Sequence, residues 1–471
     1  MKIKFPSAYT ILFGLIIAVA VATWFVPAGQ YDRQTNPALG KEVPVPGTYK
    51  QVDPNPQGFT DVVLAPIAGF YDPGSNEARA IDVALFVLII GGFLGIVTRT
   101  GAIDAGIERA MMRLRGREKW MIPILMALFA AGGTIYGMAE ESLAFYALII
   151  PVMIAARYDA VTGVAIIMLG AGVGTLGSTI NPFATVIASN AAGVPFTDGI
   201  VLRFVILILC WLACVAFVMR YAERVRQDPE RSIVADKRVS NEEHFLKGRG
   251  NPGDGNGLEL TLTHQIVLVI FGLSFAVMIW GVSAGGWWMA EMSALFIVSS
   301  IVVGVIGRMS EEDFTSTFVD GARDLLGVAL VIGIARGIVV VMDAGKITDT
   351  ILFWAEGAVS GLTEVGFINT MFGLEVVLSF LVPSSSGLAV LTMPIMAPLA
   401  DFSGVQRDLV VTAYQSASGL VNLINPTFAV VMGGLALGRV PYERWLRFMW
   451  PLLLILTAII MASISIVALL D

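Results

Sequence analysis

Two long apolar stretches of this sequence are each interrupted by the tripeptide Ile-Asn-Pro, at residues 180–182 and 424–426. Proline lacks a backbone N–H and clashes with the preceding helical turn, and the residue before it prefers an extended conformation. Both stretches must therefore break as helices at the Asn-Pro bond. In a lipid bilayer such a break survives only where protein covers it or where it lines a cavity, because unsatisfied backbone groups are costly there.

The composition indicates that these breaks do lie in a membrane. Of the 471 residues, 56% are hydrophobic and only 14% are charged, which is too few to cover the surface of a soluble protein of this size. The net charge of −7 gives no basic face for nucleic acid. The two Cys and two His form no disulfide or metal pattern, and no nucleophile–base pair or phosphate loop is present. We therefore expect neither an enzyme nor a cofactor.

The sequence predicts an all-α polytopic protein of the bacterial inner (plasma) membrane. Apolar segments of roughly 20 residues predict spanning helices. Basic residues cluster at 99–119, 220–249 and 439–447, and such clusters mark cytoplasmic loops. The N-terminus is expected in the cytoplasm, and its apolar run to residue 26 is too long for a signal peptide, which predicts a retained helix.

The order of segments predicts two repeats of opposite orientation. We expect a first transmembrane helix at 1–27, an extracytoplasmic lobe at 28–79, a first repeat at 80–222, a cytoplasmic linker at 223–262, scaffold helices at 263–307 and a second repeat at 308–471. In each repeat, two short apolar segments around a polar tip predict a re-entrant hairpin, at 121–157 and 367–400, and the interrupted stretch predicts a broken helix, at 161–192 and 408–437. Each tip is followed at similar intervals by Pro-hydrophobe-Met and then by Ile-Asn-Pro. Inverted repeats with broken helices are typical of secondary transporters.

The polar residues at the tips and breaks are the predicted substrate site. Freed carbonyls ligate cations such as Na⁺, and the N-termini of the half-helices favour a carboxylate. A simple proline kink is the alternative to a site, and two matched copies favour the site. The predicted substrate-binding residues are Glu140, Glu141, Ser142, Ser384, Ser385 and Ser386 at the tips and Ser178, Thr179, Asn181, Asn422, Asn425 and Thr427 at the breaks, with Na⁺ expected near Ser178, Asn181 and Asn425.

Four ionisable residues interrupt the apolar segments, and charges at membrane depth are functional candidates. Glu140 and Glu141 could bind a substrate ammonium or guanidinium group, could hold a proton, or one of them could merely cap a hairpin arm. Arg336 could face an anionic substrate or form an ion pair with Glu375.

Several segments resemble the ion transporter superfamily, and within it the YfcC-type, ArcD-like basic amino acid antiporters, which are related to C4-dicarboxylate carriers. These segments include FVPAGQYDR (25–33), GMAEES (137–142), GSTINPF (177–183), LVPSSSGLAVLTMPIMAPLAD (381–401) and NLINPTF (422–428). The resemblance implies a homodimer in which a scaffold holds a mobile transport domain, with elevator-like alternating access. Related dicarboxylate carriers have Ser-Asn-Thr type motifs at the tips, whereas the tips here are Glu-Glu-Ser and Ser-Ser-Ser.

The leading hypothesis is therefore a secondary active transporter of small organic ions that exchanges basic amino acids, with H⁺ or Na⁺ as the coupling ion. The alternative is a Na⁺- or H⁺-coupled carboxylate transporter, in which the half-helix N-termini and the serines take the carboxylate. A channel is disfavoured, since paired polar hairpins favour alternating access over an open pore.

Overall fold

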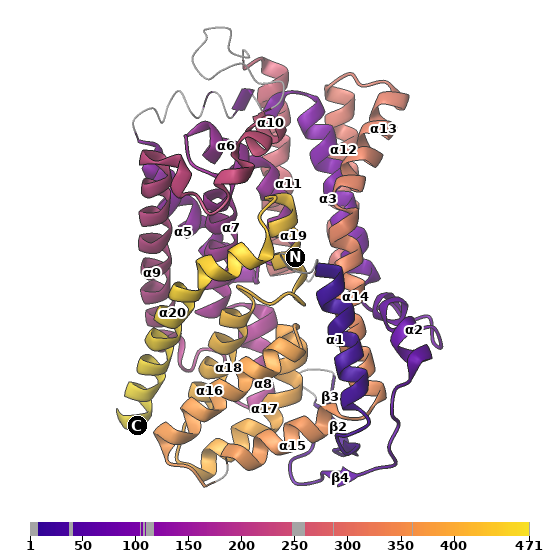
Figure 1. The fold of residues 1–471 in the computed structure, drawn as a ribbon, viewed down its shortest axis with the longest axis vertical. Helices are drawn as coiled ribbons and strands as arrows, with labels where there is room; N and C mark the ends of the chain where they lie inside the picture. Colours follow the sequence, from indigo (N-terminus) through magenta and orange to yellow (C-terminus); the bar gives the residue numbers. More distant parts are fainter. Residues whose placement is uncertain are drawn as a thin grey trace, which may run out of the picture.

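The computed structural model describes residues 8–36, 41–103, 105–106, 109, 117–246, 260–285, 287–359 and 361–470. Helices dominate the described chain (Figure 1). Seven of them are long and apolar enough to cross a membrane, or eight spans when the bent pair Glu311–Asp324 and Ala329–Ala344 is taken as one. The prediction of a helical membrane protein is thus confirmed in outline, and the departure from an all-α chain is four short strands in the predicted lobe.

A first helix group forms the right-hand side of Figure 1. Within it α14 packs against α1 and α2, while α3 packs against α12 and α13. Its members are α1 (Ala8–Ala22), α2 (Phe59–Phe70), α3 (Ile81–Arg99), α11 (Leu262–Gly285), α12 (Met289–Ile306), α13 (Glu311–Asp324) and α14 (Leu326–Ala344).

Glycines bring the helices of this group into backbone contact. A Cβ atom placed on Gly69 of α2 would lie 1.9 Å from the carbonyl oxygen of Gly333 on α14. A Cβ on Gly321 of α13 would lie 2.4 Å from the carbonyl oxygen of Gly91 on α3. Small residues allow such close approach between membrane helices. At both crossings, α2 with α14 and α13 with α3, facing glycines therefore allow the two backbones to touch.

A second helix group holds both predicted hairpins and both predicted broken helices, mostly on the left of Figure 1. Helix α5 packs on α7 and α16 packs on α18, while α7 and α18 cross each other and α9 packs on α20. Its members are α5 (Met121–Tyr136), η2 (Glu140–Phe145), α6 (Tyr146–Ala155), α7 (Ala160–Leu176), η3 (Pro182–Val186), α8 (Ile187–Ala192), α9 (Ile200–Gln227), α15 (Thr348–Val359), α16 (Glu364–Leu381), α17 (Ser385–Phe402), α18 (Arg407–Val421), α19 (Ala429–Leu437) and α20 (Tyr442–Leu470).

The predicted linker at 223–262 is partly helical. It holds the end of α9, η4 (Pro229–Arg231), η5 (Ala235–Lys237) and α10 (Arg238–Leu246), and α10 packs on α6. Arg444 at the start of α20 forms an ion pair with Asp236, and this hydrogen-bonded contact lowers the pKa of the Asp236 carboxyl. The glycine-rich remainder of the linker, residues 247–259, lies outside the described residues.

The lobe after α1 is built from short strands that contact α15. Strand β1 (Gly29–Gln30) pairs antiparallel with β4 (Lys50–Gln51), and β2 (Arg33–Asn36) pairs with β3 (Lys41–Pro44). Arg33 donates to both carboxylate oxygens of Asp349 on α15, over 2.7 and 2.9 Å. The hydroxyl of Tyr31 donates to Glu356 over 2.6 Å. These contacts attach the lobe to α15, the helix that precedes α16.

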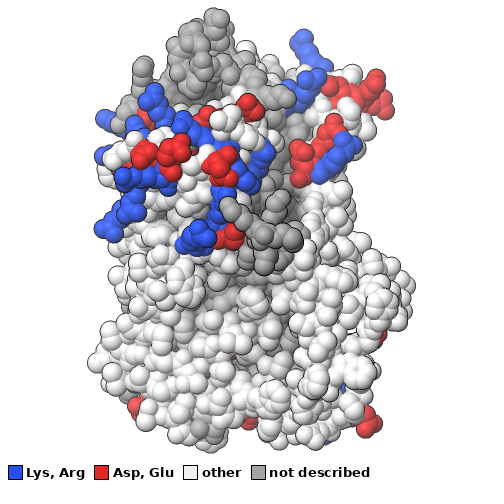
Figure 2. Space-filling view, in the orientation of Figure 1, with Lys and Arg blue, Asp and Glu red and all other residues white. Residues whose placement is uncertain are grey.

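Charged residues gather at one end of the molecule. Figure 2 shows lysines, arginines and acidic residues concentrated at the end where α10 and α13 lie, above a broad surface of uncharged residues. Many helices also carry large exposed hydrophobic side chains, such as Leu212, Ile301 and Leu454. Exposed apolar area on this scale is typical of a surface that faces lipid.

Candidate functional site

The first helix break lies between α7 and α8, at the predicted Asn-Pro bond. Asn181 caps the resumed helix: its Oδ1 accepts hydrogen bonds from the backbone N–H groups of Phe183 and Ala184, over 2.8 and 3.1 Å. Its Nδ2 donates to the carbonyl of Gly133 on α5, over 3.2 Å. The asparagine therefore joins the break to the first arm of the preceding helix pair.

The second break, between α18 and α19, repeats this arrangement. The Oδ1 atom of Asn425 accepts from the backbone N–H and the hydroxyl of Thr427, over 3.1 and 2.8 Å. Its Nδ2 donates to the carbonyl of Ser379 on α16, over 3.2 Å. Both asparagines are buried, so these hydrogen bonds form away from water.

The two breaks are connected through α18. Gln415 donates from Nε2 to the carbonyl of Ser178 over 2.7 Å and accepts at Oε1 from the hydroxyl of Thr185 over 2.7 Å. Ser178 and Thr185 share a hydroxyl contact of 2.7 Å. The hydroxyl of Thr179 lies 3.0 Å from that of Thr134 on α5. The sequence analysis missed Gln415, although a glutamine within an apolar helix is itself a signal.

Backbone carbonyls freed at both breaks accept side-chain donors. At the first break, the Leu176 carbonyl accepts from Ser416 over 3.2 Å and the Ser178 carbonyl is bonded by Gln415. Free carbonyls at these positions, expected from the sequence, are therefore not found.

At the second break, residues of α20 supply the donors. The Leu423 carbonyl accepts from the indole N–H of Trp445 over 3.0 Å, and the Ile424 carbonyl accepts from the hydroxyl of Tyr442 over 2.7 Å. Among the described residues no cluster of three or more His, Cys, Asp or Glu could hold a metal. Na⁺ near Ser178, Asn181 and Asn425 stays a prediction.

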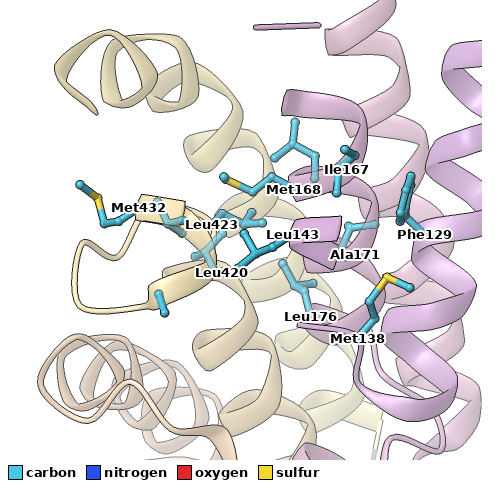
Figure 3. Close-up of a cluster of buried hydrophobic side chains, with 14 of the residues drawn as sticks. Phe129, Met138, Leu143, Ile167, Met168, Ala171, Leu176, Leu420, Leu423 and Met432 are labelled. Atoms are coloured by element: carbon cyan, nitrogen blue, oxygen red, sulfur yellow. The ribbon is translucent and has the colours of Figure 1, made fainter. Parts of the chain in front are cut away.

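The tip between α5 and α6 lies against both breaks. Gly137 has a φ of +77°, and a Cβ there would lie 2.7 Å from Oδ1 of Asn181, so the tip needs glycine. Figure 3 shows Leu143 of η2 in a buried apolar cluster with Leu176 of α7 and Leu423 of the second break. The predicted tip residues therefore come from a turn that is packed between the two halves.

The two predicted acidic residues, Glu140 and Glu141, lie at the start of η2, the turn that forms this tip. Glu140 is half-buried, and Glu141 is buried with Oε2 accepting from the backbone N–H of Ala139 over 3.0 Å. Ser142 follows, fully buried. One carboxylate therefore hydrogen-bonds to the tip backbone but is buried, whereas the capping alternative expected a glutamate that faces water, and Glu140 retains partial exposure.

The tip between α16 and α17 is serine-rich, as predicted. Ser384 caps α17 by accepting from the N–H of Gly387 over 3.2 Å, and the carbonyl of Ser385 accepts from the hydroxyl of Tyr414. Ser384, Ser385 and Ser386 are all half-buried. Helix α17 packs on α8 and η3, while η2 packs on α19. Each helix pair thus contacts the far half of the opposite broken helix.

Several buried polar atoms near these contacts have no hydrogen-bond partner in the described structure. They are the hydroxyls of Ser142, Tyr146 and Ser189 and the Oδ1 atom of Asn422. Tyr146 lies against α19, since a Cβ on Gly434 would be 2.4 Å from its hydroxyl. Buried polar groups are normally satisfied, so these unpartnered atoms are unusual and they gather around the tips and breaks.

The expected ion pair between Arg336 and Glu375 does not form. Both carboxylate oxygens of Glu375 are buried and lack a hydrogen-bond partner. Arg336 is exposed on α14, where Asp343 and Arg79 are the charges that act on it. The two residues belong to different helix groups, and a sequence pattern does not report such distances.

Comparison with known proteins identifies the family. The family model described as "DcuC: C4-dicarboxylate anaerobic carrier" matches residues 5–470. An "Uncharacterized protein" of Haemophilus influenzae is 36% identical over 490 residues, covering 96% of this chain and 94% of that protein. The "Putative basic amino acid antiporter YfcC" of Escherichia coli K12 is 34% identical over 478 residues, covering 94% and 92%.

Among solved structures, MtrF of Neisseria gonorrhoeae, which is described as illuminating a class of antimetabolite efflux pumps, matches over 98% of this chain and 95% of its own, at 16% identity and a TM-score of 0.46. The likeness to YfcC-type proteins predicted from the sequence is confirmed by the identity over nearly the whole chain. The chain therefore belongs to the C4-dicarboxylate anaerobic carrier (DcuC) family of membrane transporters.

Proposed function

We propose that this chain is a secondary active transporter of small organic ions across the inner membrane, with its substrate bound between the helix tips and the helix breaks. The observation that carries this proposal is the duplicated asparagine contact, from Asn181 to Gly133 and from Asn425 to Ser379. Two broken helices, each joined in the same way to the helix pair before it, are typical of transporters built from repeats.

In this proposal α5–α6 and α16–α17 are re-entrant hairpins of two inverted repeats. The matched contacts support it, since α5 packs on α7 as α16 packs on α18, and η2 packs on α19 as α17 packs on α8. The N-terminus and the charged end in Figure 2 are cytoplasmic, because basic residues remain on that side of a membrane.

We further propose elevator-type movement in a homodimer. In this proposal the first helix group serves as the scaffold, since it holds neither of the two broken helices. The second group serves as the mobile part, which touches the scaffold through α19 on α14 and η2 on α3. The homodimer rests on the family resemblance.

Basic amino acids are the proposed substrates. Glu140 and Glu141 place two carboxyl groups at a tip beside buried polar atoms without partners, and carboxylates suit ammonium and guanidinium groups. The relative named as a basic amino acid antiporter supports this choice.

A C4-dicarboxylate, coupled to Na⁺ or H⁺, is the second candidate. The description of the family model favours it. In this case the serines at Ser384 to Ser386 and the half-helix N-terminus at Pro182 would hold the carboxylates, and the glutamates would serve ion coupling.

The test is uptake into proteoliposomes that contain the purified chain and are preloaded with arginine, ornithine, citrulline, succinate, citrate or acetate, with and without Na⁺ and pH gradients. Saturable exchange of arginine or ornithine supports the first candidate. Ion-driven succinate uptake supports the second. Absence of any saturable flux across this panel contradicts the proposed function.

A further inference from the structure

Glu375 lies on α16, in the first arm of the helix pair that ends at the serine tip. Its side chain is 0% exposed, and neither carboxylate oxygen has a hydrogen-bond partner. One turn further on, the hydroxyl of Ser379 is also buried and without a partner. The carbonyl of the same Ser379 accepts the hydrogen bond from Asn425. A buried, unpaired carboxyl therefore lies one helical turn from the second break.

The two neighbouring hydroxyls each donate to a backbone carbonyl in the described structure. Thr392 on α17 lies beside Glu375, but its hydroxyl donates to the carbonyl of Leu388 over 3.0 Å. Tyr414 on α18 is close enough for its charge to interact with that of Glu375, and its hydroxyl donates to the carbonyl of Ser385. A protonated carboxyl can donate to the remaining lone pairs of such oxygens, whereas a carboxylate has to compete with the Leu388 carbonyl for the Thr392 proton.

The charged groups of the surrounding helices do not pair with Glu375. The helices packed on α16 are α15, α17, α18 and α20. Besides Tyr414, their described acidic and basic residues lie elsewhere: Asp349 pairs with Arg33, Glu356 with Tyr31, Asp401 with Arg407 and Arg444 with Asp236, Asp408 lies near Arg203, Glu443 lies near Arg444, and Arg447 is exposed. An isolated carboxylate in this environment is costly, so the site favours a bound proton.

The other half of the molecule shows that the fold does not need a carboxyl at this position. Gly133 and Ser379 are equivalent, since each carbonyl accepts from the asparagine of its break. The residue four positions earlier is Glu375 on α16 and Phe129 on α5. Phe129 is 3% exposed and packs on Phe145 at 5.3 Å between ring centroids. The same helix contact is thus built from apolar residues in the first half.

We propose that Glu375 is a proton-binding site that couples proton movement to transport, loading a proton in one access state and releasing it in the other. This inference rests on the proposed function and extends it by naming the coupling ion and its position. The Asn425–Ser379 contact links the site to the second break, so movement of that break would change the surroundings of the carboxyl.

Infrared spectroscopy tests the proton without any substrate. The full-length protein in lipid at neutral pH should show the C=O stretching band of a protonated carboxyl, and Glu375→Gln should lose that band. Glu364→Gln, on the same helix but exposed, is the control and should keep it. An unchanged band in Glu375→Gln overturns the proposal even if no substrate has been found.

Transport provides the second test, in proteoliposomes that contain a pH-sensitive dye. With arginine, ornithine or succinate as the probe, the unmodified chain and Glu364→Gln should move protons with substrate, and Glu375→Gln should lose all proton movement. Equal proton movement in Glu375→Gln overturns the proposal, as does coupling to Na⁺ alone. If the unmodified chain transports none of the six substrates of the uptake panel, the proposed function fails, and the infrared band separately decides whether Glu375 binds a proton.

Discussion

Asn425 donates a side-chain hydrogen bond of 3.2 Å to the backbone carbonyl of Ser379, and thereby joins a broken helix to the helix pair that precedes it. Asn181 makes the equivalent bond to Gly133. Each asparagine also accepts from backbone N–H groups on the far side of its break. The residue before each proline thus serves two structural purposes, and it leaves no free Oδ1 lone pair for a ligand in this conformation.

Replacing either asparagine with alanine should cost about 1–2 kcal/mol of stability, because a helix cap and a buried hydrogen bond are both lost. Thermal unfolding of the purified protein measures this loss. Asn55→Ala removes an exposed hydrogen bond to the Ala344 carbonyl and should have a smaller effect. Ion-dependent transport should also fall in both variants, and normal ion dependence in Asn181→Ala and Asn425→Ala would exclude a cation site at the breaks.

Replacing Glu140 and Glu141 together with glutamine should weaken the binding of a cationic substrate about ten- to a hundredfold. Charge-assisted hydrogen bonds contribute about 1.5–3 kcal/mol, and 1.4 kcal/mol corresponds to a factor of ten. Competition assays with arginine and ornithine measure the change. Glu77→Gln, at an exposed position, is the control. Unchanged affinity in the double variant rejects the role of the acidic tip.

Gln415→Ala should destabilise the protein by about 1–3 kcal/mol, because it removes a buried donor to the Ser178 carbonyl and the acceptor of the Thr185 hydroxyl. Transport should fall with it, since the contact between α18 and the first break is lost. Gln406→Ala on the same stretch is the matched control, because Gln406 is exposed and makes no side-chain capping bond. Similar melting temperatures for the two variants would contradict this prediction.

Gly321→Val should prevent the first helix group from packing. Its Cβ would lie 2.4 Å from the Gly91 carbonyl oxygen, and backbone atoms cannot yield as a flexible side chain can. Size-exclusion chromatography of the fluorescently tagged protein should show aggregation. Gly373→Ala meets nothing within 4 Å and should be neutral or stabilising by up to about 1 kcal/mol. A monodisperse Gly321→Val protein would show that this crossing tolerates separation.

A cysteine at Ser385 reports on alternating access. Ser385 is half-buried at the second tip, and the native Cys210 and Cys214 are buried, so the background reaction with an impermeant thiol reagent should be low. We expect labelling of Ser385→Cys from the outside to change when a transported substrate is added. Constant labelling with and without that substrate argues against a moving site.

The breaks and the two helix pairs were predictable because their signals are local. Proline stops a helix wherever it occurs, so the interruptions at Pro182 and Pro426 follow from the sequence alone. The polar tips likewise mark where each helix pair turns, but the short arms expected from the sequence are not found: the helix Glu118–Ile135, α16 and α17 are each long enough to cross a membrane. The structure places α5, α6, α16 and α17 within a few residues of the expected hairpin boundaries.

The contacts that complete the site were not predictable, because they join residues far apart in the chain. A break frees carbonyls, but no local pattern shows that Gln415, Tyr442 and Trp445 donate to them. For the same reason, the sequence suggested a pair between Arg336 and Glu375 that does not form. The sequence analysis did not predict helix α2, because α2 is only 12 residues long and contains Pro66, which argues against a helix.

The contact between the lobe and α15 has a consequence for how this protein could be controlled by a binding protein. Arg33 and Tyr31 bind Asp349 and Glu356 on the helix that leads into α16. If the second helix group moves during transport, either the lobe moves with it or the hydrogen bonds from Arg33 and Tyr31 to α15 must break in each cycle. An antibody fragment that binds the lobe and α15 together would therefore inhibit transport if these contacts must break in each cycle. It would leave transport unaffected if the lobe moves with the second helix group.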